Sequence, residues 1–414
     1  MSEPPAPIRT IICEPALARY RLPAWRELAS RPAISLHLEY SSDGHVPNVD
    51  PVGIDGHFTP ARKVFQRPEL FWHAGYLAAL DSKSSATTRN STPDSAPADV
   101  VILNWNVRFL ENPLCILKAR RNKMGVVFFG HGVSKNETPA RRNIRNALGR
   151  RADCILVYSE SGRQALINDG FSPERVFVAP NSIDQTEIQA ARRDWLARPR
   201  DLEAFQRTND LGQSSPSLPF PPPTLIFCAR LDPLRRLDLL LEALPTIAQS
   251  HHGTQLLIIG GGEDEQRLRE LASHLNLLNP ANAQLPRVRF LGAVYEEKNL
   301  APWFLSSDLM VFPSHMGLSV LHSMGYGVPV LTCNDASKHG PEYDVIRPGI
   351  NGEVYEDGSV PDLAAKVVAL LNDRPKLRGM SAEALLTATR DYSIPKMIDG
   401  FEAAIRFANA RRGK

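Results

Sequence analysis

LIFCARLDPLRRLDLLLEAL, residues 225–244, joins a continuous apolar run to an amphipathic one. Residues 225–228 are apolar throughout, which is typical of a strand buried on both faces of a parallel sheet. From residue 237 onward leucines recur at helical spacing, so we expect a helix that covers such a sheet. Arg230 and Arg235 lie in the turn between the two elements. The stretch therefore predicts a strand–turn–helix unit of an α/β protein, with two arginines after the strand.

The same alternation of short apolar runs and helical stretches extends along the chain in both directions. The runs fall into two sets, and each set predicts a parallel sheet with helices on both faces. The fold class is therefore α/β, with two doubly wound, Rossmann-like domains. The expected strands are residues 10–13, 34–38, 100–103, 126–129, 154–157 and 176–178 in the first set, and 225–228, 256–259, 288–291, 309–312 and 328–331 in the second.

Two segments interrupt this pattern. Residues 81–96 are polar and rich in small side chains, which indicates a surface insertion. Residues 214–223 are rich in proline, as expected of a semi-extended connection between domains. We therefore expect a first domain at residues 1–190, a linker or insertion at 191–223 and a second domain at 224–394.

Composition excludes some classes of protein. The net charge is only +3 at pH 7, so overall charge identifies no partner. No apolar stretch approaches the ~20 residues of a membrane span, and the N-terminus does not resemble a signal peptide. The five cysteines are scattered without metal-ligand spacing, which suits a reducing cytoplasm. No D-x-D pair is present to hold a metal on a nucleotide, so we expect metal-free chemistry and no cofactor.

Polar or glycine-rich turns follow several expected strands, where α/β proteins bind ligands. Arg230 and Arg235 beside a helix N-terminus would suit a diphosphate, although a solvated basic turn has the same pattern. Gly261 and Gly262 follow the strand at 256–259 and either admit a ligand or form a plain tight turn.

In the first half, His131 lies between two glycines after the strand at 126–129, where it is placed to meet a ligand. A turn histidine in solvent is the alternative. Asn106 and Arg108 follow the preceding strand and are expected to open on the same side.

Taken together, these segments resemble glycosyltransferase family 4, which has the two-domain GT-B fold. The likeness covers about residues 9–410 and is strongest in the second half. Arg230 matches the family's arginine, and Arg235 stands where the family usually has lysine. Six motifs in the family's order carry the likeness, which makes it more specific than one motif would be. They are VFVAPNSID (176–184), ARLDPLRRLDLLLEAL (229–244), LLIIGGGEDEQRLREL (256–271), VRFLGAV (288–294), DLMVFPS (308–314) and GYGVPVL (325–331).

The resemblance also shows what is missing. The family usually carries two glutamates, separated by seven residues, near the donor sugar and the nucleotide ribose. Ser314 and His322 occupy those positions here, so neither position supplies a negative charge. The segment GLSVLHSMGYGVPV (317–330) resembles a branch of bacterial surface-polysaccharide glycosyltransferases with His-Ser at this point. Glu342 is the nearest carboxylate that follows.

The resemblance implies that the second domain binds the donor and that the domains face each other across a cleft. Arg230 and Arg235 would hold the diphosphate, while His131 and Glu342 would orient the sugar or help to carry a proton. The last helix, residues 395–414, is expected to pack back on the first domain. The other candidates for donor-sugar, ribose or cleft contacts are Ser314, Gly317, Leu318, Ser319, His322, Asn106, Arg108, Gly261, Gly262, Ala293 and Val294.

These implications predict a retaining, metal-independent glycosyltransferase in surface-polysaccharide synthesis. It would move a sugar from a nucleotide diphosphate to a hydroxyl of a glycan or lipid-linked acceptor. Two alternatives stay open: a non-catalytic protein that binds nucleotide sugars, because both glutamates are absent, and a nucleotide-sugar epimerase of the same fold. The acceptor is not identified, because EPALARYRLPAWRELA (14–29) replaces the family's early Gly-Gly loop.

Ten basic residues and one acidic residue lie between residues 118 and 151. A solvated helix face explains this charge, and so does peripheral attachment to anionic lipid at the inner face of the plasma membrane. Few aromatic residues interleave with these charges, which argues against nucleic acid. We therefore expect a cytoplasmic protein, with membrane attachment as an open alternative.

Overall fold

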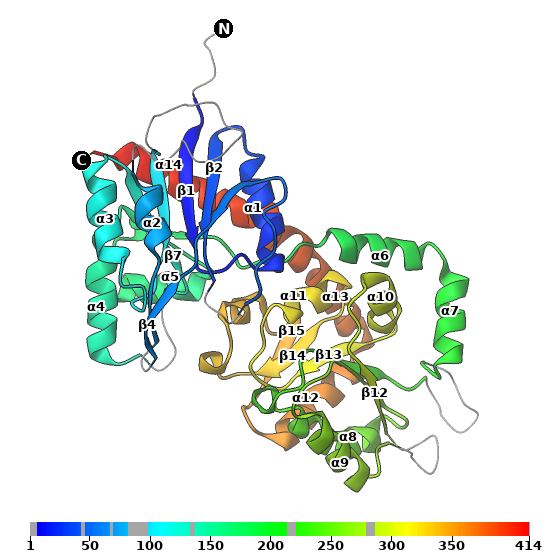
Figure 1. The fold of residues 1–414 in the computed structure, drawn as a ribbon. Helices are drawn as coiled ribbons and strands as arrows, with labels where there is room; N and C mark the ends of the chain where they lie inside the picture. The colour runs from blue at the N-terminus through cyan, green and yellow to red at the C-terminus, as the bar shows by residue number, and fades with distance from the viewer. Residues whose placement is uncertain are drawn as a thin grey trace. The chain divides into compact units, whose positions relative to one another are not determined.

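The computed structural model describes residues 6–42, 46–66, 69–81, 98–132, 137–212, 221–278 and 286–413. The chain forms two compact units (Figure 1). The first comprises Met1–Asn181 with Ile394–Lys414, and the second comprises Ser182–Ser393. Nearly all of the polar segment at 81–96, and most of the proline-rich segment at 214–223, lie outside the described residues.

Within its described residues the first unit contains a seven-stranded parallel sheet in the order β3-β2-β1-β6-β7-β8-β9. The chain leaves β1 on one side and later returns on the other, so a topological switch lies between β1 and β6. β4 and β5 form a separate antiparallel pair. The strands are β1 (Ile8–Glu14), β2 (Ile34–Tyr40), β3 (Asp55–Phe58), β4 (Arg62–Gln66), β5 (Glu69–Trp72), β6 (Val100–Asn104), β7 (Gly125–Gly130), β8 (Cys154–Val157) and β9 (Val176–Val178).

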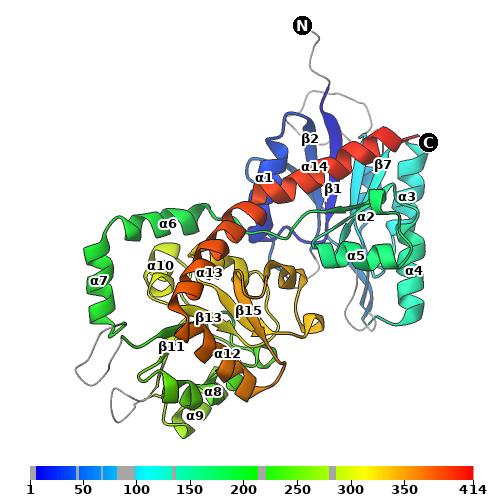
Figure 2. The same ribbon diagram turned by 180° about the vertical axis from the view of Figure 1, so that it is seen from behind.

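Alternate side chains of this sheet enter two apolar layers, as expected when both faces are covered. Ile12 of β1 packs in one core cluster with α1 and α14, whereas Ile11 and Cys13 pack in another with α2, α3, α4 and α5. Figure 2 shows α14 lying along its face of the sheet. The helices are α1 (Leu22–Ala29), α2 (Ala74–Ala79), α3 (Asn112–Arg121), α4 (Pro139–Gly149), α5 (Glu160–Asn168) and α14 (Ile394–Arg411).

Helix α14 packs against the first unit's sheet although it comes last in the chain. Its Phe401 lies edge-on to Trp25 of α1, with ring centroids 5.2 Å apart. Gly400 permits a close approach, because a Cβ there would lie 2.2 Å from the carbonyl oxygen of Val178. Burial of this apolar helix face favours the return of the chain to the first unit.

Among its described residues the second unit contains a six-stranded parallel sheet in the order β12-β11-β10-β13-β14-β15. β10 lies between β11 and β13, so a second topological switch lies here. The strands are β10 (Thr224–Cys228), β11 (Gln255–Ile259), β12 (Arg287–Gly292), β13 (Leu309–Phe312), β14 (Val330–Cys333) and β15 (Gly352–Tyr355). The helices are α6 (Thr186–Leu196), α7 (Pro199–Thr208), α8 (Leu237–Ser250), α9 (Glu265–His274), α10 (Glu297–Leu305), α11 (Ser319–Gly325), α12 (Val360–Asn372) and α13 (Arg374–Leu386).

Both units thus have a parallel sheet with helices around it, which confirms the α/β class and the two Rossmann-like domains. The stretch 191–208, for which the sequence suggested a linker, is instead helical in α6 and α7. Trp195 packs edge-on to Phe205, and its Nε1 donates to the Lys298 carbonyl oxygen at 2.9 Å. These aromatic side chains anchor the two helices to the second unit.

Candidate functional site

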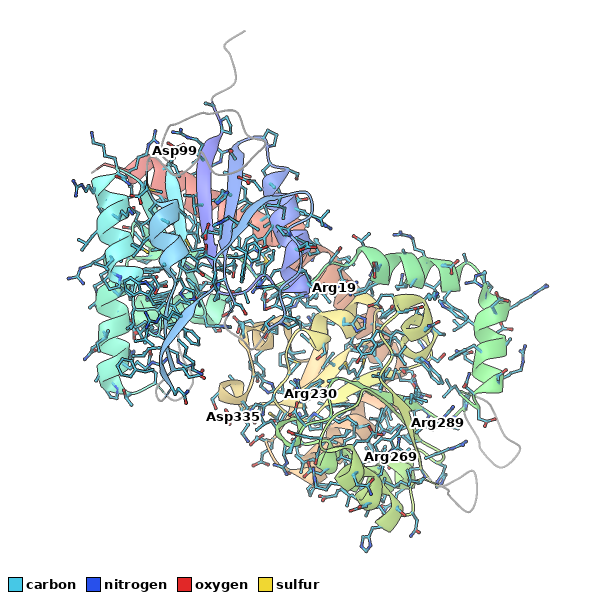
Figure 3. All side chains as sticks on the ribbon, in the orientation of Figure 1. Arg19, Asp99, Arg230, Arg269, Arg289 and Asp335 are labelled. Atoms are coloured by element: carbon cyan, nitrogen blue, oxygen red, sulfur yellow. The ribbon has the colours of Figure 1, made fainter. Side chains whose placement is uncertain are left out.

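The turns after β10, β11, β12 and β13 share one edge of the second unit's sheet. They carry most of the residues that the sequence suggested for donor binding. Arg230 comes two residues after β10 and is exposed (Figure 3). Its side chain forms no hydrogen bond or ion pair with a described residue, so the guanidinium group is accessible to an anion.

Arg235 links two of these turns. Its Nε donates to Asp232 Oδ2 at 3.1 Å, and its Nη1 donates to the His315 carbonyl oxygen at 2.8 Å. The guanidinium carbon lies 5.3 Å from the centre of the Phe312 ring, at the end of β13. Arg235 is therefore fixed across the switch point between β10 and β13, whereas Arg230 is not.

The glycine run after β11 is explained mainly by packing against the turn after β10. A Cβ at Gly260 would lie 1.9 Å from the carbonyl oxygen of Ala229, and one at Gly262 would lie 2.0 Å from that of Leu231. At Gly261 nothing approaches a Cβ closer than 3.8 Å. Of these three glycines, Gly261 therefore leaves room for a ligand, while Gly262 serves the fold.

The turn after β13 is held in an uncommon backbone conformation. His315 has φ +52°, a left-handed conformation that costs a non-glycine residue roughly 1–2 kcal/mol. Ser314 is 1 % exposed, and its hydroxyl oxygen lies 3.0 Å from His315 Nδ1. The Met316 N–H donates to His339 Nδ1 at 3.1 Å, and His339 Nε2 lies 3.1 Å from the Cys333 carbonyl oxygen. His339 therefore carries a proton on Nε2 and holds the turn in place, with Ser314 buried beneath the surface.

The segment that leads into α11 is less crowded. A Cβ at Gly317 would meet no atom of a described residue within 4 Å. Ser319, the first residue of α11, has a buried hydroxyl oxygen without a hydrogen-bond partner among the described residues. Leu318 packs partly against the core, as does Val294 after β12, whereas Ala293 is exposed. Open space at Gly317 beside an unsatisfied hydroxyl is what a polar ligand would require.

His322 of α11 forms a hydrogen-bonded group with a residue from another helix. Its Nε2 lies 3.0 Å from both carboxylate oxygens of Glu297, the first residue of α10. Tyr326 donates its hydroxyl hydrogen to Glu297 Oε2 at 2.6 Å. Burial raises the pKa of Glu297, but the hydrogen bonds from His322 and Tyr326 outweigh burial and hold that pKa below its usual value. Helix α10 thus supplies a carboxylate where α11 has none.

Glu342 lies beside the turn after β13. It is 6 % exposed and belongs to the 3-10 helix Pro341–Val345. Its Oε2 would lie 2.2 Å from a Cβ at Gly340, and the Gly340 N–H donates to the Met316 carbonyl oxygen at 3.3 Å. The structure therefore brings Glu342 to the same turn that contacts Arg235.

In the first unit, His131 follows β7 directly, is exposed, and has its ring 4.9 Å from that of Tyr158. Asn106 has a local role, because its side-chain oxygen accepts a hydrogen bond from the Arg108 N–H at 3.0 Å. The Arg108 side chain is exposed. β6 and β7 are neighbours, so these residues lie at adjoining strand ends.

Two charged residues that the sequence did not single out lie at the same edge of the first sheet. Glu14 ends β1 and is 7 % exposed, and burial raises the pKa of its carboxyl group from 4.5 to about 7, although the positive charge of Arg21 opposes this. Arg21 is also 7 % exposed, and its guanidinium carbon lies 4.9 Å from the centre of the Tyr158 ring. Both residues belong to the segment 14–29 that stands in place of the family's Gly-Gly loop, and this departure is the feature of the sequence that could have pointed to them.

No group of three or more histidine, cysteine or acidic side chains in the described ranges could hold a metal ion. In the same part of the chain, no helix combines the length and the apolar character needed to cross a bilayer.

Comparisons with known proteins agree with this architecture. Residues 222–373 match the family model for glycosyl transferases group 1, and residues 58–187 match that for glycosyltransferase family 4. The chain therefore belongs to the family 4-like glycosyltransferases with the GT-B fold. It is similar over 96 % of its length to the crystal structure of Anabaena HepE in complex with UDP, with a TM-score of 0.67, 15 % identity and 100 % of that chain covered.

Curated relatives are more similar in sequence but only over part of their length. The GDP-mannose-dependent monoacylated alpha-(1-6)-phosphatidylinositol monomannoside mannosyltransferase of Corynebacterium glutamicum is 24 % identical over 276 residues, which cover 64 % of this chain. The D-inositol 3-phosphate glycosyltransferase of Nocardia farcinica is 28 % identical over 269 residues, which cover 62 % of this chain. The matches span 65 % and 53 % of these two relatives.

Proposed function

We propose that this protein transfers a sugar from a nucleotide-diphosphate donor to a hydroxyl group of a glycan or glycolipid. The observation that carries the proposal is the pair of arginines at the switch point of the second sheet. Arg230 is exposed, and Arg235 is fixed on the turn after β13. Two cations at this edge would stabilise the negative charge that develops on a departing diphosphate. The relative named for GDP-mannose and the neighbour with bound UDP support a nucleotide-diphosphate ligand.

The proposal extends to a retaining reaction without a metal ion, in the synthesis of surface polysaccharide. Glu342 would contact the donor sugar from beside the turn after β13, and His322 would contact the ribose. Gly317 and Gly261 would leave space for the nucleotide. His131 would act on the first unit's side, by orienting the sugar or carrying a proton.

Nucleotide binding and transfer are tested separately. A thermal-shift screen with UDP, GDP, dTDP and their sugars should find at least one stabilising ligand, because a ligand that binds only the folded state raises its stability. Transfer from the matching nucleotide sugar should persist in excess EDTA. Loss of transfer in EDTA that manganese or magnesium restores would overturn the metal-free part of the proposal, and no stabilising ligand would overturn the whole.

A non-catalytic protein that binds nucleotide sugars is the second candidate. It is favoured by the absence of a carboxylate at residues 314 and 322 and by the burial of Ser314. The discriminating measurement is release of free nucleotide from the stabilising nucleotide sugar. Hydrolysis or transfer above the rate in buffer excludes the non-catalytic candidate.

The acceptor side of the proposal includes peripheral contact with an anionic membrane. Several basic side chains of the region 118–151 are engaged in ion pairs, such as Arg142 with Asp169 and Arg120 with Asp153. Large apolar side chains are nevertheless exposed on α3 and α4: Leu114 is 45 %, Leu117 66 % and Ile144 63 % exposed. The described basic residues of this region that form no ion pair with a described residue are Arg121, Lys123, Arg141, Arg150 and Arg151, of which Arg150 donates to the Asp169 carbonyl oxygen. Apolar and basic side chains together suit a surface of anionic lipid.

A further inference from the structure

The group formed by Glu297, His322 and Tyr326 lies where three strand ends of the second unit meet. Glu297 begins α10, which follows β12, and His322 belongs to α11, which follows β13. All strands of this sheet are parallel, so the ends of β12 and β13 lie at the same edge as the end of β10. The group is therefore at the same sheet edge as Arg230.

The hydrogen bonds determine which ring nitrogen of His322 carries the proton. An ionised carboxylate only accepts hydrogen bonds, so Nε2, at 3.0 Å from both oxygens of Glu297, must donate. Aromatic contacts fix the plane of the ring: Phe304 lies edge-on at 5.1 Å between centroids, and Tyr326 lies edge-on at 5.6 Å. A neutral imidazole held in this way has Nδ1 as its acceptor.

Nδ1 of His322 forms no hydrogen bond with a described residue, and the side chain is 17 % exposed. We propose that Glu297 is a positioning residue that fixes the Nε2-protonated form of His322, so that Nδ1 accepts one hydrogen bond from a ribose hydroxyl of the nucleotide. This inference rests on the proposed function, because it concerns the same donor site.

A single acceptor nitrogen has a consequence for specificity. A carboxylate can accept from both hydroxyls of a ribose at once, whereas one imidazole nitrogen accepts from one. The protein should therefore sense the 2′-hydroxyl or the 3′-hydroxyl through this group, and not both. A purely structural role, in which the group only ties α10 to α11, predicts no sensitivity to either hydroxyl through Glu297.

The test uses UDP and GDP with their 2′-deoxy and 3′-deoxy forms, with affinities measured by calorimetry. For the nucleotide that binds, we expect removal of one hydroxyl to weaken binding about tenfold, which is typical of one lost hydrogen bond in a buried site. In Glu297→Gln the side-chain amide can donate to Nε2, so this nitrogen no longer has to carry the proton. The variant should therefore bind the parent nucleotide about as weakly as the wild type binds the deoxy nucleotide. The matched control is Glu296→Gln, because Glu296 is exposed and pairs with Lys298.

Two further measurements separate positioning from structure. Nitrogen NMR of the His322 ring should show the proton on Nε2 in the wild type and a loss of that preference in Glu297→Gln. Tyr326→Phe removes the second hydrogen bond to Glu297 without touching the ring nitrogen, so it should lower stability yet keep the hydroxyl preference.

The outcomes are distinct. Binding of UDP or GDP with equal affinity for all deoxy forms, unchanged discrimination in Glu297→Gln, or a proton on Nδ1 in the wild type would overturn this inference alone. Failure of the wild type to bind either nucleotide would overturn the proposed function and this inference with it.

Discussion

Glu14, which is buried, and Glu297, which is partly buried, are carboxylates at the carboxyl edge of a parallel sheet, one in each unit, and their pKa values are shifted in opposite directions. Glu297 receives hydrogen bonds from His322 and Tyr326, and its pKa lies below the usual value despite burial. No described residue donates a hydrogen bond to the Glu14 carboxylate, and burial raises its pKa to about 7. Burial alone therefore does not decide the charge of such a group; its hydrogen-bond partners do.

The comparison also separates two kinds of site. In the second unit Arg235 and His322 at the sheet edge are each fixed by hydrogen bonds to other described residues, as a preorganised ligand site requires, whereas Arg230 is not. In the first unit Glu14 and Arg21 are buried with aromatic neighbours and without a close ion pair between them. Stability should therefore depend on pH differently in the two units.

The largest effect is expected from Glu14→Gln. Between pH 4.5 and about 7 the folded state retains a proton on Glu14 that the unfolded state has released. The unfolding free energy should therefore fall as pH rises through this window, by about 3 kcal/mol in total. Glu14→Gln should remove this part of the slope, so the variant should be more stable than the wild type at pH 8, as measured by urea unfolding between pH 4.5 and 8.

His37 provides a check on that experiment. Burial lowers its pKa, but hydrogen bonds to Asp55 and Glu39 outweigh burial and raise it to about 9. Its contribution to stability is complete below pH 6.5 and is lost as pH rises through 9. Glu14→Gln, Glu160→Gln and the wild type should all lose this stabilising contribution of His37 at high pH. Glu160→Gln, an exposed change in the same unit, should leave the slope unchanged; an equal slope in Glu14→Gln would show that Glu14 is not protonated in the folded state.

The next effect concerns the sheet edge of the second unit. Arg230→Ala should weaken binding of the stabilising nucleotide diphosphate by about 1.5–3 kcal/mol, the range for a hydrogen bond to a charged group. Turnover should fall as well, because the same cation would stabilise the transition state. Arg269→Ala is the matched control, since Arg269 lies in α9 over the Phe290 ring and pairs with Glu265 (Figure 3).

If Arg230→Ala and Arg235→Ala both bind the nucleotide as the wild type does, the diphosphate does not lie at this switch point. Arg235→Ala carries an additional risk, because Arg235 also donates to the His315 carbonyl oxygen. A thermal melt of each variant separates loss of fold from loss of binding.

The sheet edges of the two units show which features of the fold and the candidate site the sequence predicts. Continuous apolar runs located most strands, since period and burial are local signals, and Arg230, Gly317 and His322 were placed by motif. β15, β3 and the β4–β5 pair were not expected, because they lack long apolar runs.

The sequence does not predict which residues form hydrogen bonds with the candidate site residues. Glu297 lies 25 residues from His322 in the chain, and no local pattern marks it as the carboxylate that would contact this ring. In the sequence Glu14 only begins the segment that replaces the family's Gly-Gly loop, and its burial follows from packing that no local pattern shows. Periodicity therefore predicts elements, whereas pairing between helices requires the structure.

A smaller effect is expected when the histidine that pairs with Glu297 is replaced by a second acidic residue. The sequence alone suggests that glutamate at residue 322 could be tolerated, as in the family. His322→Glu would instead place a second carboxylate close to Glu297, and like charges disfavour ionisation of both groups. We expect roughly tenfold weaker nucleotide binding, or about 1.4 kcal/mol. Adding Glu297→Gln should restore affinity, and a single variant with normal affinity would show that Glu297 has moved away.

The smallest effect per residue concerns the first unit's surface. Arg141 of α4 forms no ion pair with a described residue and lies one helical turn from Ile144, which is 63 % exposed. Replacing it with glutamate should weaken binding to vesicles of phosphatidylserine and phosphatidylcholine by about 1 kcal/mol for each unit of charge removed near the surface. The measurement is sedimentation with vesicles at low and high salt, since about 0.5 M salt should abolish an electrostatic contact.

Arg207→Glu is the control, because it makes the same charge change on α7 of the second unit, where Arg207 is also exposed. If both changes weaken sedimentation equally, net charge and not the α3–α4 surface accounts for binding. If the wild type sediments equally with neutral and anionic vesicles, or with neither, the membrane contact is wrong, and the acceptor must reach the first unit by another route.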